Sequence, residues 1–253
     1  MNKTSIIAVA NQKGGVGKTT TVINLGASMA MNNKEILLID FDPQANATSG
    51  FGLDNDSEKD ICSLLLGKRS LDEVIISTEV EGLFLVQGSR GLAGLEIELA
   101  GAEEREFLLL EALEDSVDRF DYVLIDCPPS LGLLTINALV AATEVLITLQ
   151  SEYYALEGLS HLMNTIKNIR KRWNANLSIN GVVLTMFDSR LKLSREVAED
   201  VKEHLGSILY NTCIPRNVKL GEAPSYGMPA LLYDARSKGA ASYLNLATEV
   251  LQR

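Results

Sequence analysis

The sequence is poor in cysteine and has no long hydrophobic stretch. Its three cysteines, Cys62, Cys127 and Cys213, are far apart and form no Cys-x-x-Cys pair, so we expect core residues in a reducing cytoplasm. No run of eighteen apolar residues suggests a membrane-spanning helix, and no segment resembles a signal peptide. With 46% apolar and 22% charged residues, the 253-residue chain is expected to be one soluble, folded domain covering 1–253.

Positive charge is also scarce, since the formal net charge is −10, which argues against a uniformly basic nucleic-acid binder. The charges are segregated. Segment 96–121 holds ten acidic residues against Arg105 and Arg119, whereas segment 167–195 holds seven basic residues against Asp188. A protein of this kind can still meet a polyanion with one face. The alternative is that both segments are ordinary solvent-exposed helix faces.

Short apolar runs alternate with longer segments of helical period. The expected strands are 5–10, 35–40, 83–87, 122–127, 145–149, 180–186 and 208–214. The expected helices include 19–31, 95–117, 133–142, 155–173, 194–205 and 242–251. This alternation predicts an α/β fold with a mostly parallel, doubly wound sheet and helices on both faces. Ligands of such sheets bind at the carboxyl ends of the strands.

A glycine-rich segment follows the first expected strand and precedes the first expected helix. Backbone N–H groups of such a loop converge on phosphate oxygens, a lysine reaches the terminal phosphates, and a threonine hydroxyl can bind Mg²⁺. We therefore predict a site for ATP and Mg²⁺, with Lys18 as a catalytic residue, Thr19 as a metal ligand, and nucleotide contacts from Gly14, Gly15, Val16, Gly17, Lys18, Thr19 and Thr20.

The loop departs from the common P-loop pattern at its entrance. Gln12 stands where that pattern has glycine, and a second lysine, Lys13, follows it. A single lysine suffices to hold a nucleotide within one subunit, so Lys13 has a different role or is a solvent-exposed turn residue.

Three further motifs follow strands. Asp40 and Asp42 have the spacing that places side chains on one side of an extended chain. We assign Asp42 to orienting the attacking water and Asp40 to the magnesium shell. Asp126 closes another apolar run, where a carboxylate can hold a magnesium-bound water. After the last expected strand, Pro215 and Asn217 could contact a base, although a simple strand-to-loop turn also explains them.

The C-terminal helix carries one apolar stripe, made up of Tyr243, Leu246, Ala247, Val250 and Leu251. Arg253 is its only cation, whereas a helix that lies on a membrane surface normally shows several. We therefore expect this helix to dock on the core.

Together these motifs closely resemble the ParA/Soj partition ATPases, over essentially the whole chain. The segments that carry the resemblance are 13–19, 40–44, 126–130, 152–158, 214–217 and 222–225. The resemblance implies an ATP-bound homodimer that binds double-stranded DNA without sequence preference. A ParB-type centromere-binding partner would stimulate hydrolysis and release. It also implies a cytoplasmic, nucleoid-associated protein.

The resemblance also assigns residues. Lys13 would reach across the dimer to the nucleotide of the other subunit, which makes it a catalytic and a nucleotide-binding residue. Asp42 matches the hydrolytic aspartate, and Pro215 and Asn217 match the adenine region. DNA contacts map to Arg190 and, with a change from arginine, to Lys219.

The chain starts directly at its first strand, so we expect no N-terminal DNA-binding domain. One alternative is a MinD-like membrane-associated ATPase, which the C-terminal helix disfavours, so no membrane contact is expected. A second alternative is a metabolic enzyme, such as a nucleotide-dependent ligase or an iron-sulfur reductase. The cysteine pattern that a reductase needs to hold its cluster is missing. A third is a tyrosine kinase, which would carry a tyrosine-rich tail, but this tail has only Tyr243.

Overall fold

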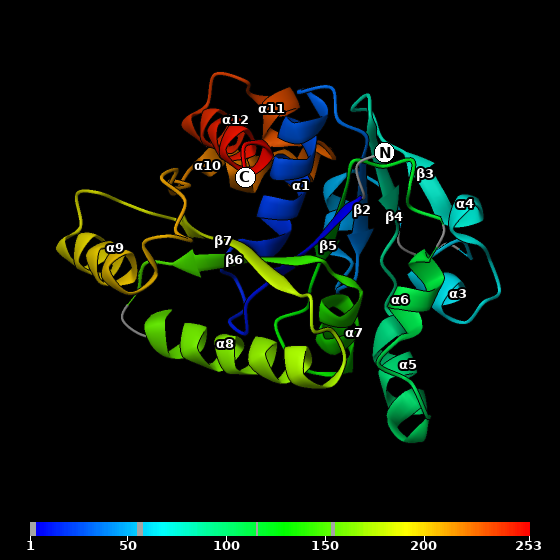
Figure 1. Ribbon diagram of the computed structural model, residues 1–253. Coiled ribbons are helices and arrows are strands. Elements are labelled where there is room, and N and C mark those ends of the chain that lie inside the picture. Colours follow the sequence, from blue (N-terminus) through cyan, green and yellow to red (C-terminus); the bar gives the residue numbers. More distant parts are fainter. Residues whose placement is uncertain (1–3, 55–57, 115, 153–154) are drawn as a thin grey trace.

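The computed structural model describes residues 4–54, 58–114, 116–152 and 155–253 (Figure 1). Within these residues, seven strands form one sheet in the order β3-β4-β2-β5-β1-β6-β7. Only the pair β3–β4 is antiparallel among them. The mostly parallel sheet is therefore confirmed. The strands are β1 Ser5–Ala10, β2 Ile36–Asp40, β3 Ile75–Ser77, β4 Leu83–Val86, β5 Tyr122–Asp126, β6 Glu144–Gln150 and β7 Ser178–Thr185.

Helices cover both faces of the sheet, as expected (Figure 1). One face carries α1 Lys18–Ala30, α10 Val218–Glu222, α11 Ala230–Tyr233 and α12 Lys238–Leu251. The other carries α3 Ile61–Leu65, α4 Leu71–Val74, α5 Gly91–Glu98, α6 Leu108–Leu113, α7 Leu133–Ala141, α8 Ala155–Arg172 and α9 Lys192–Leu205. Shorter elements are α2 Asn46–Gly50 and the 3₁₀ turns Leu99–Gly101 and Ala223–Tyr226.

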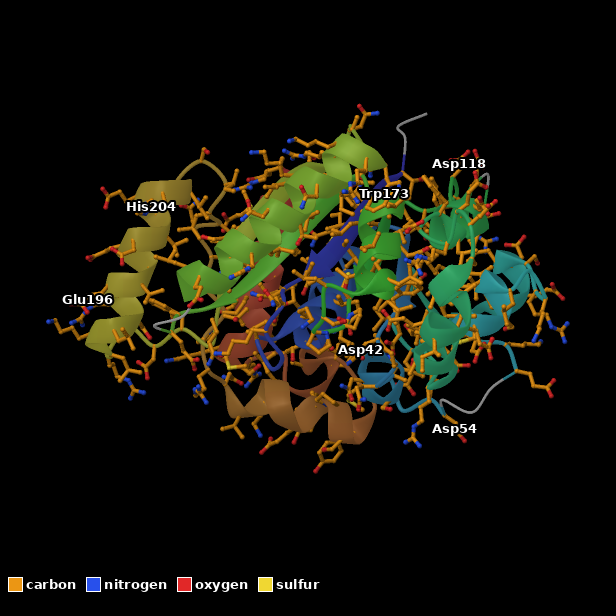
Figure 2. All side chains as sticks on the ribbon, turned by 90° about the horizontal axis from the view of Figure 1, so that it is seen from below. Asp42, Asp54, Asp118, Trp173, Glu196 and His204 are labelled. Carbon is orange, nitrogen blue, oxygen red and sulfur yellow. The ribbon has the colours of Figure 1, made fainter. Side chains whose placement is uncertain are left out.

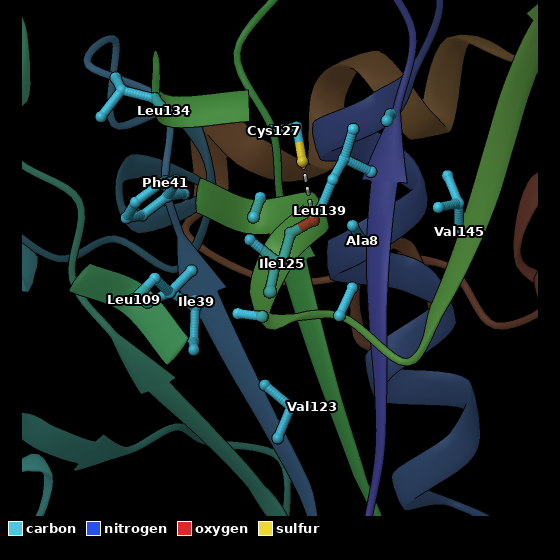
Figure 3. Close-up of a cluster of buried hydrophobic side chains, with 14 of the residues drawn as sticks. Ala8, Ile39, Phe41, Leu109, Val123, Ile125, Cys127, Leu134, Leu139 and Val145 are labelled. Atoms are coloured by element: carbon cyan, nitrogen blue, oxygen red, sulfur yellow. Dashed lines mark hydrogen bonds between the residues drawn. The ribbon is translucent and has the colours of Figure 1, made fainter. Parts of the chain in front are cut away.

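Two apolar clusters fill the space between the sheet and these helices. On one side, Ala8, Ile39 and Ile125 pack with residues of α7, as Figure 3 shows. On the other side, Ile7 and Leu38 pack with residues of α1 and α12. Successive strand residues point to opposite faces, so the neighbours Ile7 and Ala8 enter different clusters. Strands buried on both sides are therefore continuous apolar runs in the sequence.

The prediction of a strand over 208–214 is wrong. Tyr210 and Ile214 donate backbone hydrogen bonds to β7, but the pairing is confined to isolated bridges. Between them, the N–H groups of Asn211 and Thr212 bond to the carboxylate of Glu249 on α12. This side chain takes the place of a strand partner. The short edge strand β3 was not predicted.

The single helix expected over 95–117 is also wrong. Helix α5 ends at Glu98, a 3₁₀ turn covers Leu99–Gly101, and α6 begins only at Leu108. Between them, Glu104 has a left-handed backbone with φ of 55°, which a continuing helix does not allow. Residue 115 lies outside the described residues.

The last helix docks on the core, as predicted. It begins four residues earlier than expected, because the Ser237 hydroxyl accepts a hydrogen bond from the N–H of Ala240 and caps it. Tyr243 is buried against α1, where its hydroxyl lies 3.0 Å from that of Thr21. None of the helices in the described parts of the chain combines the length and apolar character of a bilayer crossing.

Candidate nucleotide-binding site

The loop between β1 and α1 has the conformation of a phosphate cradle. Gly15 and Gly17 have φ values of 72° and 86°, which residues with a Cβ rarely adopt. Gly17 forms the N-cap of α1, so the first N–H groups of that helix face the same space. The Thr185 hydroxyl at the end of β7 donates to the carbonyl of Val16 at 2.8 Å and anchors the loop to the sheet.

Asn11 also shapes this loop, and sequence reasoning missed it. Its side-chain amide donates to the carbonyl of Thr148 on β6 at 2.6 Å. Its Oδ1 accepts the N–H of Lys13 at 2.9 Å. The only signal in the sequence is its place directly before the loop, since its partner Thr148 is 137 residues away.

A cavity of about 270 Å³ opens in front of the loop. Its lining combines the loop with the ends of β2, β5 and β7, and consists of Gly14, Gly15, Gly17, Lys18, Thr19, Thr20, Asp42, Gln44, Asn46, Pro129 and Met186. The structure thus brings the predicted loop residues and Asp42 together, and it adds the side chains of Gln44 and Asn46.

Lys18 lines this cavity, and Asp126 lies near Lys18. Burial lowers the pKa of Lys18, although Asp126 and Asp42 oppose the shift. Its ammonium donates to the carbonyl of Lys13 at 3.2 Å. Asp126 is fully buried, and neither of its oxygens has a hydrogen-bond partner among the described residues. Burial and the neighbouring Asp40 raise the pKa of Asp126 well above its usual value, and Thr19 lies close enough to oppose the shift.

A buried carboxylate without a hydrogen-bond partner is unfavourable unless an ion or a water molecule binds to it. Magnesium fits here, because it takes hard oxygen ligands, retains waters and uses one or two carboxylates beside substrate phosphates. Thr19 supplies a hydroxyl from the loop that lines the cavity. The donor set of Thr19 and Asp126 is therefore compatible with the predicted cation.

Asp42 faces the cavity and Asp40 does not. Asp42 lines the cavity, and its Oδ1 accepts the N–H of Gln44 at 2.9 Å. The carboxylate of Asp40 turns to α2, where Oδ2 accepts both the N–H and the hydroxyl of Thr48 at 2.7 Å. The expectation that both carboxylates share a side does not hold, because the chain leaves the strand after Asp40. A magnesium role for Asp40 stays a prediction.

A second cavity, of about 220 Å³, adjoins the first and shares Gly17, Thr20 and Met186 with it. Pro215 and Asn217 line this cavity, as expected for a base-binding region. Asn217 Oδ1 accepts the N–H of Lys219 at 2.9 Å and caps α10. Its NH₂ group and the second lone pair of Oδ1 are left to meet a base.

Lys13 does not line the cavity of its own loop. Its ammonium forms an ion pair with Glu152, and both side chains are about half exposed. Gln150 donates to the other carboxylate oxygen of Glu152 at 2.6 Å. The Lys13 ammonium therefore lies beside a residue that follows β6 closely in the chain. Tyr153 and Tyr154 of the same motif lie outside the described residues.

Both candidate DNA-binding cations are paired within the chain. Arg190 bonds to both carboxylate oxygens of Asp188, at 2.9 and 2.7 Å. This contact lowers the pKa of Asp188 to about 2. Lys219 donates to Glu222 at 2.9 Å and lies over the ring of Tyr233. Each carboxylate would compete with a DNA phosphate for its cation.

The last turn of α8 holds Arg170, Lys171 and Arg172. Figure 2 shows Trp173, which directly follows α8, well above Asp42 in that view. The cysteines are free and belong to the core or pack against it, as predicted.

The loop, the second lysine and the unpartnered aspartate at the end of the neighbouring strand define a P-loop nucleotide-binding protein of the α/β class. The family described as "AAA domain" matches residues 4–179. The chain is 52% identical to the sporulation initiation inhibitor protein Soj of Bacillus subtilis, over 97% of both chains. It is 47% identical to the chromosome partitioning protein ParA of Caulobacter vibrioides, over 100% of this chain and 96% of that one. The chain therefore belongs to the ParA/Soj family.

Solved structures agree with this fold. Cobyrinic acid a,c-diamide synthase from Mycobacterium smegmatis, with bound ADP and magnesium, is 35% identical with a TM-score of 0.84, over 98% of this chain and 94% of that chain. The cell division ATPase MinD of Pyrococcus furiosus is 28% identical with a TM-score of 0.80, over 98% of both chains.

Proposed function

We propose that the chain is a chromosome- or plasmid-partitioning ATPase. It binds ATP with Mg²⁺, forms a homodimer in that state and then binds double-stranded DNA without sequence preference on the nucleoid. Hydrolysis, stimulated by a ParB-type centromere-binding partner and slow without it, ends the DNA-bound state. The names of its relatives support this proposal, since they include Soj and the chromosome partitioning protein ParA.

The position of Lys13 carries the homodimer part of the proposal. Lys18 lines the phosphate cavity of its own chain, whereas Lys13 is not among the lining residues and is paired with Glu152. A half-exposed ion pair of this kind is worth only ~0.2–1 kcal/mol. Lys13 can therefore leave Glu152 at small cost and reach a nucleotide held by a second copy of the chain.

The chain's own residues divide the work of hydrolysis. Lys18 and the loop N–H groups hold the phosphates, and Lys13 of a second copy adds positive charge where the transferred phosphoryl group carries its negative charge. Asp42, which lines the cavity, orients the attacking water. Thr19 and the water held by Asp126 would bind magnesium, which supplies charge neutralisation at the phosphates when bound.

Binding to arbitrary duplex DNA tests the proposal. The purified protein is measured without nucleotide, with ADP, and with ATP plus Mg²⁺, each at two salt concentrations. Binding only with ATP, weakened by salt, is expected because phosphate contacts release counterions. ATP turnover without DNA binding in any state would refute the DNA-positioning role.

A metabolic ligase is the second candidate, favoured by the likeness to cobyrinic acid a,c-diamide synthase. Such an enzyme would turn over ATP only with an acceptor substrate, and duplex DNA would have no effect. A MinD-like membrane role has less support, because the apolar face of α12 is already buried against α1.

A further inference from the structure

The segment 127–132 links Asp126 to helix α7 and runs past the phosphate loop. Pro129 lines the phosphate cavity together with Gly14, and a Cβ built on Gly14 would lie 3.7 Å from the Cβ of Pro129. Further along, the Thr135 hydroxyl bonds to the carbonyl of Ser130. A shift of this segment would therefore reach both the loop and Asp126.

The far end of this segment is held by a residue with no role in the site described above. Glu96 lies on α5, in the acidic segment whose purpose the sequence did not explain. Its Oε1 accepts the N–H of Leu133, the first residue of α7, at 2.8 Å. This N–H belongs to the first turn of α7, where no helical carbonyl is available as a partner.

The contact leaves no room for another side chain. A Cβ built on Gly132 would lie 2.5 Å from the same Oε1 of Glu96. Glu96 is half-buried, whereas the next residue, Ile97, is 77% exposed. Helix α5 thus presents one side to solvent and, through Glu96, holds the start of α7.

We propose that Glu96 is a positioning residue for the segment 127–132 and, through it, for Asp126. Its carboxylate fixes the amino end of α7, so that Asp126 and Pro129 keep their places beside the phosphate loop. The link from Glu96 to magnesium rests on the proposed function, because it assumes that Asp126 holds a magnesium-bound water. The link from Glu96 to the backbone of α7 does not.

Asn137 offers a matched control on the same helix. Its side chain donates to the carbonyl of Arg105 at 2.8 Å and accepts the N–H of Leu109 at 3.2 Å. It therefore ties α7 to the same acidic segment, but from the middle of the helix. Asn137→Ala should lower overall stability without a specific effect on the segment 127–132.

Hydrogen exchange in the nucleotide-free protein tests the contact itself. Glu96→Ala should speed exchange of the Leu133 amide, relative to amides in the middle of α7, by about tenfold or more, as expected for loss of a hydrogen bond to a charged group. Glu96→Gln keeps an acceptor oxygen and should restore protection. Glu96→Asp keeps the charge but is one methylene shorter, so its Leu133 amide should exchange as fast as in the alanine variant. It replaces Glu96→Ala in the experiment if the alanine variant does not fold.

The second measurement is Mg²⁺-dependent binding of a fluorescent ATP analogue. The Mg²⁺ concentration for half-maximal binding should rise severalfold in Glu96→Ala, return to within about twofold of wild type in Glu96→Gln, and stay unchanged in Asn137→Ala. Unchanged Leu133 exchange, or equal Mg²⁺ shifts in the Glu96 and Asn137 variants, would overturn the proposal. If the wild type shows no Mg²⁺-dependent binding, the proposed nucleotide site fails, and the exchange result still decides whether Glu96 positions α7.

Discussion

Substitution of Asp40 by asparagine should change how the stability of the nucleotide-free protein depends on pH. Complete burial raises the pKa of Asp40 to about 6, although hydrogen bonds from Thr48 oppose the shift. Asp126 lies directly opposite on the neighbouring strand β5. Asparagine keeps the volume and one oxygen that can accept both Thr48 hydrogen bonds, but it removes the charge.

The size of the effect follows from proton linkage. The folded state holds its proton up to a pH of about 6, whereas the unfolded state loses it near 3.8, so folding binds a proton between these values. The free energy of unfolding therefore falls as pH rises through this range. Integration between about pH 5 and about pH 7.5 gives a loss on the order of 1 kcal/mol from Asp40 in the wild type. Asp40→Asn should lack this contribution.

Urea unfolding at both pH values, in the presence of a chelator, measures the difference. The wild type should lose on the order of 1 kcal/mol more than Asp40→Asn between the low and the high pH, because the other titrating groups, apart from Asp126, are common to both proteins. Asp40 also raises the pKa of Asp126, so its removal reduces the pH dependence further. The same pH dependence in both proteins would show that folding does not raise the pKa of Asp40.

Three further predictions concern the proposed function. Asp42→Ala should still bind ATP and dimerise, but its hydrolysis rate should fall by at least about a hundredfold, since the variant lacks the group that orients water. Wild-type turnover would remove Asp42 from the mechanism. Glu152→Gln frees Lys13 and should tighten ATP-dependent dimerisation by up to about fivefold in analytical ultracentrifugation, whereas weaker dimerisation would show that Glu152 itself serves the dimer. Arg190→Ala should weaken DNA binding for all sequences and lower the salt slope by about one unit; Asp188→Ala, which releases Arg190, is the control and should strengthen binding.

Features that depend on neighbours in the chain were predictable. The phosphate loop was recognised because its glycines, Lys18 and Thr19 act within a few residues, between an apolar strand and the start of a helix. The alternation of strands and helices predicted the parallel sheet, since strands buried on both faces are continuous apolar runs. The apolar stripe of α12 likewise predicted a docked helix, because one helical face must be buried.

Features that depend on distant partners were not predictable. Segment 208–214 has the pattern of a strand, yet Glu249 on the last helix takes two of its N–H groups. The spacing of Asp40 and Asp42 did not reveal that Asp42 lines the cavity whereas Asp40 accepts hydrogen bonds from Thr48. Glu96 was one acidic residue among ten until the fold placed it at the amino end of α7.

The order of residues therefore settled the fold class and the phosphate loop, because periodicity and loop geometry are local properties. The partners of Lys13 and Glu96 were decided only by the tertiary fold. These contacts join residues that are up to 139 positions apart, and no local pattern encodes which of several carboxylates meets a given donor.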